Sequence, residues 1–223
     1  MTTFGEIAEP GSRNLWEDWD DSSQDLVKLQ WQNSSEAPKE IDDVIIFEGR
    51  YLSDYIKHQS QCSLVNTVSG ASINLYKLNN CNGYICTVRD YSIVQSSKII
   101  ELLKDYLLHS REVIAVQTKP LSDYNTTEPV LDCVVRSVST SKLPNNSRFT
   151  YPKLEQPNII SGVAAGAISL REHMDLTGRA IVCYIEHPED YQIEKVQKLL
   201  EKFNLYQSDK AMPGTLLNSN LYI

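Results

Sequence analysis

Residues 96–117, with the sequence SSKIIELLKDYLLHSREVIAVQ, predict a helix that leads directly into a buried strand. Apolar side chains recur at helical spacing between Ser96 or Ser97, where the helix begins, and His109, near which it ends. The following segment, Glu112–Gln117, is an almost continuous apolar run, which is typical of a strand buried on both faces of a sheet. A helix beside such a strand is the basic unit of an α/β fold.

The same alternation of helix and strand continues toward the C-terminus. The pattern predicts a helix of small residues over 162–174, a strand over 179–185 and an amphipathic helix over 191–204. The run Gly-Val-Ala-Ala-Gly at 162–166 has neither the lysine nor the Gly-x-Gly spacing of a phosphate-binding loop. We therefore interpret it as a place where the helix packs closely on a neighbouring element.

Toward the N-terminus, β-rich segments are separated by Asn, Gly and Ser residues. Asn82-Gly83 is a pair that suits a tight hairpin turn. A later β-rich run is followed by a polar loop over 139–157 that contains three prolines. The predicted strands in these regions cover 43–47, 63–68, 72–78, 84–89 and 130–138.

These patterns predict the α/β fold class, with helices covering a central, mainly β, sheet in a single domain. The chain has 223 residues, of which 41% are hydrophobic, enough for a full core in one domain. The predicted parts are an acidic N-terminal arm over 1–42, the α/β domain over 43–210 and a flexible C-terminal tail over 211–223.

The formal net charge of -8 belongs to the N-terminal part of the chain. Residues 1–43 contain eleven acidic and three basic side chains, whereas the rest of the chain carries 18 of each sign. Because no segment offers the excess of Lys and Arg that neutralises phosphates, we expect neither nucleic acid nor an anionic membrane surface as a partner.

No window of the sequence approaches the roughly 20 apolar residues of a membrane span. Residues 1–10 also lack the basic and apolar regions of a signal peptide. We therefore expect a protein without a membrane span that is cytoplasmic or also nuclear.

The acidic arm contains all three tryptophans of the chain, Trp16, Trp19 and Trp31. One interpretation is that these rings pack the arm back onto its own domain. The alternative is that Trp16 and Trp19 anchor a partner, because aromatic residues dominate interface hot spots.

A search for catalytic and ligand-binding motifs finds no GxSxG elbow, HExxH pair or paired CxxC. Cys81 and Cys86 lie five residues apart, but no histidine stands at ligand spacing, so they do not predict a zinc site. The odd number of cysteines, five, favours buried thiols over a disulfide framework. We predict no catalytic residue, no metal ligand and no cofactor. The four histidines lie near predicted helix ends or loops, which favours cap or surface roles; they are His58, His109, His173 and His187.

Two other stretches carry a resemblance to a known family. The first, Leu154-Glu155-Gln156-Pro157-Asn158, precedes the small-residue helix, and the second is the end of the chain, Asn218–Ile223 (NSNLYI). Together with the opening residues Thr3–Glu6 (TFGE), they resemble the proteasome assembly chaperone family, in particular the subunit that pairs with proteasome assembly chaperone 2.

The last three residues, Leu221, Tyr222 and Ile223, fit the hydrophobic-tyrosine-any pattern (HbYX motif) that proteasome-binding proteins place at a free C-terminus. The resemblance implies that this tail inserts between neighbouring α subunits. The terminal carboxylate of Ile223 would pair with a pocket lysine, Tyr222 would pack and hydrogen-bond, and Leu221 would fill an apolar hollow.

The resemblance as a whole implies a non-enzymatic chaperone of 20S proteasome assembly. Such a protein acts as a heterodimer with proteasome assembly chaperone 2, binds α subunits, promotes α-ring formation and prevents off-pathway dimerisation of α-rings. The helix that begins at Gly162 is one candidate for the heterodimer surface, although a core contact explains its small residues equally well. Two other hypotheses remain open: a hydrolase or phosphorylase-like enzyme on a related α/β fold, and a regulator of mature proteasomes that binds through the same tail.

Overall fold

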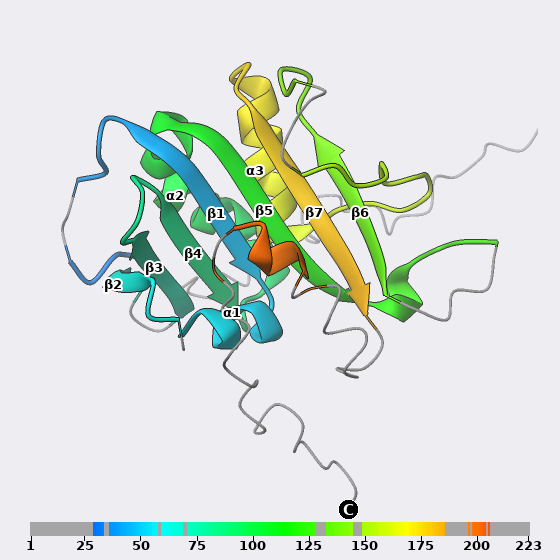
Figure 1. The fold of residues 1–223 in the computed structure, drawn as a ribbon, viewed down its shortest axis with the longest axis horizontal. Coiled ribbons are helices and arrows are strands. Elements are labelled where there is room, and N and C mark those ends of the chain that lie inside the picture. The colour runs from blue at the N-terminus through cyan, green and yellow to red at the C-terminus, as the bar shows by residue number, and fades with distance from the viewer. Residues whose placement is uncertain are drawn as a thin grey trace, which may run out of the picture.

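A seven-stranded mixed sheet forms the centre of the molecule, with the strand order β2-β3-β4-β1-β5-β7-β6 (Figure 1). The four strands β4, β1, β5 and β7 run parallel to one another, and β2, β3 and β6 join as antiparallel strands. The structure, a computed structural model, describes residues 29–33, 36–57, 59–68, 71–127, 133–144, 149–185, 196, 198–203 and 205. The strands are β1 (Ile41–Glu48), β2 (Cys62–Thr67), β3 (Ser72–Leu78), β4 (Tyr84–Arg89), β5 (Ser110–Pro120), β6 (Val134–Ser139) and β7 (Gly178–Ile185).

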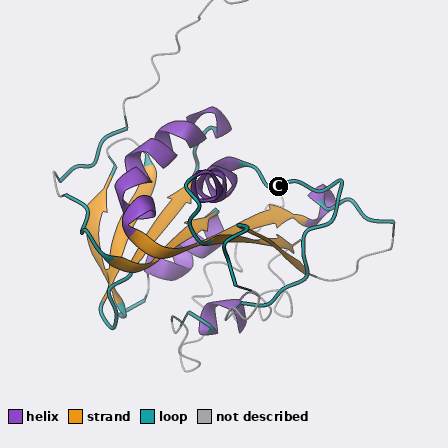
Figure 2. Cartoon of the chain, turned by 90° about the horizontal axis from the view of Figure 1, so that it is seen from above, coloured by secondary structure: helices purple, strands orange, loops and turns teal. Residues whose placement is uncertain are grey.

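Helices cover both faces of this sheet (Figure 2). Helices α2 (Ser96–His109) and α3 (Gly162–His173) lie on one face, while α1 (Arg50–Lys57) and the helical segment near Leu200 lie on the other. Short 3-10 turns, η1 (Ile93–Gln95) and η2 (Leu121–Asp123), precede α2 and follow β5. The expected α/β fold class, a single domain with a helix-covered sheet, is confirmed.

The central prediction, a helix over 96–109 followed by a buried strand, is confirmed, and the strand is longer than predicted. The predicted strand over 130–138 is β6, which begins at Val134; residues 130–132 lie outside the described part of the chain. In the predicted helix over 191–204, the apolar residues that the structure describes are buried as expected: Val196, Leu199, Leu200 and Phe203. Ile193, the fifth inward residue of that prediction, lies outside the described residues.

Helix α1 was missed by the sequence pattern. It spans eight residues, and only Leu52, Tyr55 and Ile56 form its buried apolar stripe. Two turns are too short to establish a helical period against the polar residues around them. The backbone N–H and the hydroxyl of Ser53 both donate to the carbonyl of Gly49, which anchors the first turn.

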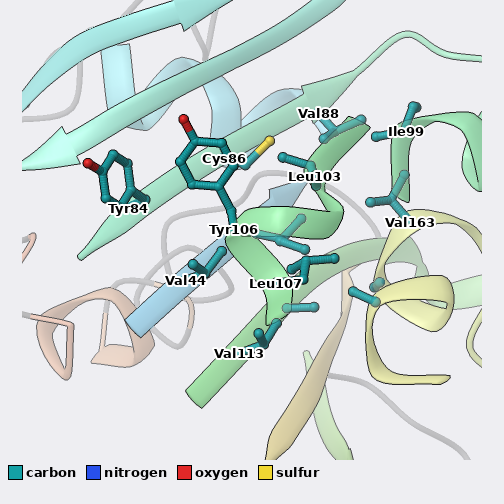
Figure 3. Packing of buried hydrophobic residues seen from close by; sticks show 14 of the residues in the cluster. Val44, Tyr84, Cys86, Val88, Ile99, Leu103, Tyr106, Leu107, Val113 and Val163 are labelled. Carbon is teal, nitrogen blue, oxygen red and sulfur yellow. The ribbon is translucent and has the colours of Figure 1, made fainter. Parts of the chain in front are cut away.

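Alternating residues of each strand point to the two faces and build two apolar clusters. Figure 3 shows part of the cluster beneath α2 and α3, with Leu103 and Leu107 lying among Val44, Cys86 and Val113 of the sheet. A β-carbon on Gly166 would stand 2.8 Å from the Ile100 side chain, so α3 and α2 approach too closely for a larger residue. The predicted close packing of the small-residue helix is thus confirmed.

Extended chain contacts part of each edge of the sheet, in one isolated bridge beside β2 (Trp31–Val68) and one on β6 (Ser137–Lys153). At β2, the backbone N–H of Gln32 donates to Thr67, and the Trp31 indole donates to the carbonyl of Leu102 on α2. At β6, Ser137 N–H donates to Pro152 and its carbonyl accepts from Leu154 N–H. Such covers protect unpaired strand edges from adding foreign strands. Trp31 therefore packs the arm onto its own domain, while Trp16 and Trp19 lie outside the described residues.

Arg171, on α3, is fully buried and donates hydrogen bonds to four backbone carbonyls. It reaches Leu107 at the end of α2 at 2.6 Å, Ser110 and Arg111 at the start of β5 at 2.9 Å each, and Thr177 before β7 at 2.7 Å. Burial lowers the pKa of Arg171 to about 10, so the group remains a cation at neutral pH. One side chain thus joins two helices and two strands.

We predict that Arg171→Lys lowers the free energy of unfolding by about 3 kcal/mol or more, because an ammonium group cannot reach all four carbonyls and is left as a buried cation with too few hydrogen bonds. Urea denaturation monitored by circular dichroism measures the loss. Arg111→Lys is the matched control, since the Arg111 side chain is exposed, and it should change stability by no more than about 0.5 kcal/mol. Equal losses in the two variants would contradict the role of Arg171.

Candidate functional site

The structure places one of the two segments that carry the predicted site residues. Leu221, Tyr222 and Ile223 lie outside the described residues. The stretch Leu154–Asn158 is described, and it lies beside the edge strand β6 and ahead of α3. Its side chains therefore show what this stretch does within the fold.

Glu155 links the stretch to β6 and to the chain after η2. Its Oε1 accepts a hydrogen bond from the Tyr124 hydroxyl, and its Oε2 accepts one from Arg136 Nε at 2.9 Å. Arg136 also donates to the Tyr124 hydroxyl at 2.8 Å, which closes a triangle of three polar side chains. Beneath the triangle, the Tyr124 and Tyr184 rings lie 5.0 Å apart, and Leu154 packs against their cluster.

Asn158, at the other end of the stretch, forms hydrogen bonds to the loop after η2. Its side chain is only 8% exposed; its Nδ2 donates to the carbonyls of Asn125 at 2.9 Å and Glu155 at 3.1 Å. Its Oδ1 accepts from the backbone N–H of Asn125 at 2.7 Å. Gln156 and Pro157, joined by a cis peptide bond, are exposed. The stretch is therefore a brace that holds the β6 edge cover to the loop after η2.

We predict that Asn158→Ala lowers the free energy of unfolding by about 1–2 kcal/mol, because the buried Asn158 amide loses its hydrogen bonds to the backbone of Asn125 and Glu155. The exposed neighbour provides the control, and Gln156→Ala should change stability by less than about 0.5 kcal/mol. Thermal and urea unfolding of both variants measure this difference. A destabilising Gln156→Ala with a neutral Asn158→Ala would show that the brace has been assigned to the wrong side chain.

A second polar cluster lies at the carboxyl ends of β1 and β5, where α3 begins. Glu48, the last residue of β1, is 6% exposed, and its Oε2 accepts a hydrogen bond from the backbone N–H of Ala164 at 2.7 Å. Its Oε1 accepts from the Tyr91 hydroxyl, and that hydroxyl accepts from Val163 N–H at 3.1 Å. A carboxylate at this point complements the positive end of the helix dipole.

Residues of β5 complete the cluster. Gln117 is the register partner of Glu48, is 5% exposed and donates through Nε2 to the Ser161 carbonyl at 3.1 Å. Lys119 donates to the Ser161 hydroxyl at 3.1 Å and to the Ile159 carbonyl at 3.3 Å. These contacts position the chain that enters α3.

The carboxyl ends of parallel strands are where α/β folds commonly bind ligands, and helix N-termini bind anions. Here the chain's own carboxylate takes that place. Sequence reasoning missed this cluster, because Glu48 reads as the polar end of an apolar run. The sequence does contain one signal: a glycine directly follows Glu48, and another, Gly162, directly precedes Val163. In the structure both glycines, Gly49 and Gly162, adopt positive φ angles, of 127° and 79°.

Burial and the hydrogen bond to Glu48 raise the pKa of Tyr91 to about 12, above its ordinary value of 10. The folded state therefore keeps the Tyr91 proton at a pH where the unfolded chain releases it, and stability is lost as pH rises from about 10 to 12. We predict that Tyr91→Phe is less stable than the parent at pH 8 but declines less steeply above pH 10. Urea denaturation of both proteins at pH 8 and above pH 10 measures the free energy of unfolding. An equal loss of stability in the two proteins above pH 10 would contradict the role of the Tyr91 hydroxyl.

Other candidate groups do not form a catalytic constellation within the described residues. Asp42, His109 and Ser110 line one open hollow of about 310 Å³ at the amino-terminal ends of β1 and β5. His109 Nδ1, however, lies 3.0 Å from the Pro38 carbonyl, and the Ser110 hydroxyl donates to Leu107. Neither side chain orients the other, so the hollow lacks the nucleophile and base arrangement of a hydrolase.

The cysteines and histidines show no shared site in the part of the chain that is described. Cys86, Cys133 and Cys183 are buried, Cys62 is partly exposed and Cys81 is exposed, and none of the five forms a disulfide bond. No group of three or more metal-binding side chains occurs among these residues. His173, like His109, lies exposed at a helix end, whereas His58 and His187 lie outside the description. None of the described helices is both long enough and apolar enough to cross a bilayer.

No family model and no curated protein matches the sequence of this chain. Solved structures do match its fold. PbaA of Pyrococcus furiosus, an archaeal homolog of proteasome-assembly chaperone, gives a TM-score of 0.58 at 15% identity, covering 85% of this chain and 90% of PbaA. A protein with unknown function from Thermoplasma acidophilum gives 0.56 at 11% identity, covering 77% of this chain and 80% of that chain.

PbaB of Pyrococcus furiosus, described as an archaeal proteasome activator, gives a TM-score of 0.51 at 13% identity, covering 80% of this chain and 93% of PbaB. At these identities the matches establish a common fold. The two Pyrococcus proteins with a stated role are a chaperone homolog and an activator, and neither is described as an enzyme.

Proposed function

We propose that this protein is a non-enzymatic chaperone for assembly of the 20S proteasome core particle and corresponds to proteasome assembly chaperone 1. It acts in the cytoplasm or nucleus as a heterodimer with proteasome assembly chaperone 2. The pair binds α subunits, promotes α-ring formation and prevents α-rings from dimerising off the pathway. The observation that carries the proposal is a PbaA-like fold in a chain that ends in Leu221-Tyr222-Ile223.

Leu205 sets an upper limit on how far from the folded body the proposed tail can dock. Leu205 is buried, and its carbonyl accepts a hydrogen bond from the Tyr55 hydroxyl at 3.5 Å, on the face that carries α1. The 18 residues that follow can span at most about 60 Å. The proposal therefore requires a pocket within about 60 Å of Leu205.

Docking uses a small set of interactions. The Ile223 carboxylate pairs with a lysine between two α subunits, Tyr222 packs and hydrogen-bonds, and Leu221 fills an apolar hollow. One charge-assisted hydrogen bond contributes about 1.5–3 kcal/mol, so a single tail binds with modest strength. Two tails on one heterodimer gain affinity through effective concentration.

A regulator of mature proteasomes is the second candidate, and the similarity to PbaB favours it. The two functions differ in the particle that is bound. A chaperone co-purifies with immature particles that lack processed β subunits, whereas a regulator co-purifies with mature ones. Mass spectrometry of particles captured on the tagged chain, with the tag at the N-terminus, distinguishes them.

We predict that deleting Leu221–Ile223 weakens binding to α subunits by about 10- to 100-fold, the equivalent of one lost charge-assisted hydrogen bond. Adding one alanine after Ile223 should weaken binding to a similar degree, because it moves the carboxylate and keeps every side chain. Pull-down and native gels of α-ring assembly measure both effects. Replacing Asn218–Asn220 by alanines is the control, and it should bind as the parent does. Unchanged binding after the deletion would refute tail docking.

A further inference from the structure

Five large apolar side chains are exposed among the described residues, and three of them lie on the two loops that lead into α2 and α3. Ile93 and Val94, in η1, are 62% and 67% exposed, and Ile159, before α3, is 73% exposed. The other two, Leu64 on β2 and Met174 after α3, lie on different elements. Isolated exposed apolar residues are ordinary, whereas a group of them marks an interaction surface. We call Ile93, Val94 and Ile159 the apolar patch.

The two loops meet at the carboxyl ends of the parallel strands. The backbone N–H of Val163 donates to the Tyr91 hydroxyl at 3.1 Å, which joins the chain just before η1 to the first turn of α3. Tyr91 precedes Ile93 by two residues, and Ile159 precedes Val163 by four. An interface of ordinary size, about 800 Å² on each partner, can therefore cover both loops.

Hydrogen bonds hold the backbone of both loops in place. At η1, the Ser96 hydroxyl donates to the Ile93 carbonyl at 2.6 Å. Before α3, Lys119 donates to the Ile159 carbonyl at 3.3 Å. The backbone that presents the apolar patch is thus ordered before a partner binds, which lowers the entropic cost of binding.

Two lysines flank the apolar patch. Lys98 follows Val94 by four residues, about one helical turn, and Lys119 holds the chain at Ile159; both are partly exposed. No ion pair joins either lysine to a residue that the structure describes. Asp90, the acidic residue that precedes η1, is paired with Arg50 at 2.5 Å. The patch therefore complements an apolar surface that carries carboxylates at its rim.

The small residues of α3, considered above as a subunit surface, are used within the fold. Gly166 lies against Ile100 of α2, and Val163, Ala164 and Ala167 are fully buried. The exposed residues of α3 are polar: Ser169, Glu172 and His173. The loop before the helix, rather than the helix itself, thus presents an apolar side chain to solvent.

We infer that the apolar patch, with Lys98 and Lys119 at its rim, binds the second subunit of the heterodimer. This inference rests on the proposed function, which supplies the partner. The patch defines what that partner presents at the contact: apolar side chains flanked by carboxylates.

Placing an aspartate in the apolar patch tests the inference. The full-length chain is titrated with proteasome assembly chaperone 2, and isothermal titration calorimetry measures the affinity. Ile159→Asp and Val94→Asp should each weaken binding by about 30-fold or more, the loss expected at an interface hot spot. Because both side chains are exposed, the melting temperature of each variant should stay within a few degrees of the parent's.

The chain offers matched controls for both parts of the surface. Leu64→Asp and Met174→Asp also replace an exposed apolar residue by a charge, and they should bind within about twofold of the parent. Lys98→Glu should weaken binding by about three- to tenfold at low salt and by less at high salt. Lys104→Glu, at an exposed position further along the same helix, should bind as the parent does.

The outcomes separate this inference from the proposed function. A parent chain that forms no complex with proteasome assembly chaperone 2 would refute both. If the parent binds, and Ile159→Asp and Val94→Asp lose no more affinity than Leu64→Asp, the inference is wrong and the proposed heterodimer stands. Variants that lose self-association but keep the parent's affinity for the second subunit would also refute the inference, because the patch would then bind another copy of this chain.

Discussion

The buried guanidinium of Arg171 is the interaction on which the arrangement of α2, α3, β5 and β7 depends. Its donors end on carbonyls at the close of α2, the start of β5 and the turn before β7. Three of these carbonyls also accept from another donor: Leu107 from the Ser110 hydroxyl, Arg111 from the Thr177 hydroxyl and Thr177 from Val113 N–H. Arg171 therefore adds a second, charged donor to backbone acceptors that lie in the interior. Because a buried cation is tolerated only when it is fully hydrogen-bonded, the same contacts that satisfy Arg171 also fix the spacing of the four elements.

Glu48 does at the opposite end of α3 what Arg171 does near its C-terminus. The two charges have the signs that the helix dipole favours at each end, and both are buried and fully used within the chain. Between these two residues, Gly166 allows α3 to approach α2 closely because it has no side chain. The position of α3 is therefore fixed by a buried charge at each end and by this close contact in the middle. Chain segments contact part of each edge of the sheet, with Asn158 and Glu155 holding the cover of β6 in place.

The pattern of apolar residues along the chain predicts the elements whose formation depends on neighbouring residues. The helices at 96–109 and 162–173 and the buried strands follow from apolar period, and the close packing at Gly166 follows from its small size. The roles of Glu48, Arg171 and Asn158 could not be predicted, because each depends on partners that are distant along the chain and meet only in the sheet. The stretch Leu154–Asn158 was identified by resemblance alone, and its brace role emerges only once β6 and the loop after η2 are in place.

The buried polar side chains of Arg171, Glu48 and Asn158 bind groups of their own chain. This affects where the proposed chaperone could recognise its partners. Arg171 and Glu48 are buried and spend their hydrogen bonds on groups of the same chain, so neither offers directional chemistry to a partner. The remaining distinctive features of the sequence are at its two ends: the excess of negative charge in residues 1–43 and the Leu221-Tyr222-Ile223 terminus. In a protein that binds through a short terminal segment, the main role of the folded domain is to hold the start of that segment in a fixed position. The domain also provides the surface to which a second subunit attaches. The buried contacts of Arg171 and Glu48 suit this role, because they fix the helices and strands of the domain relative to one another.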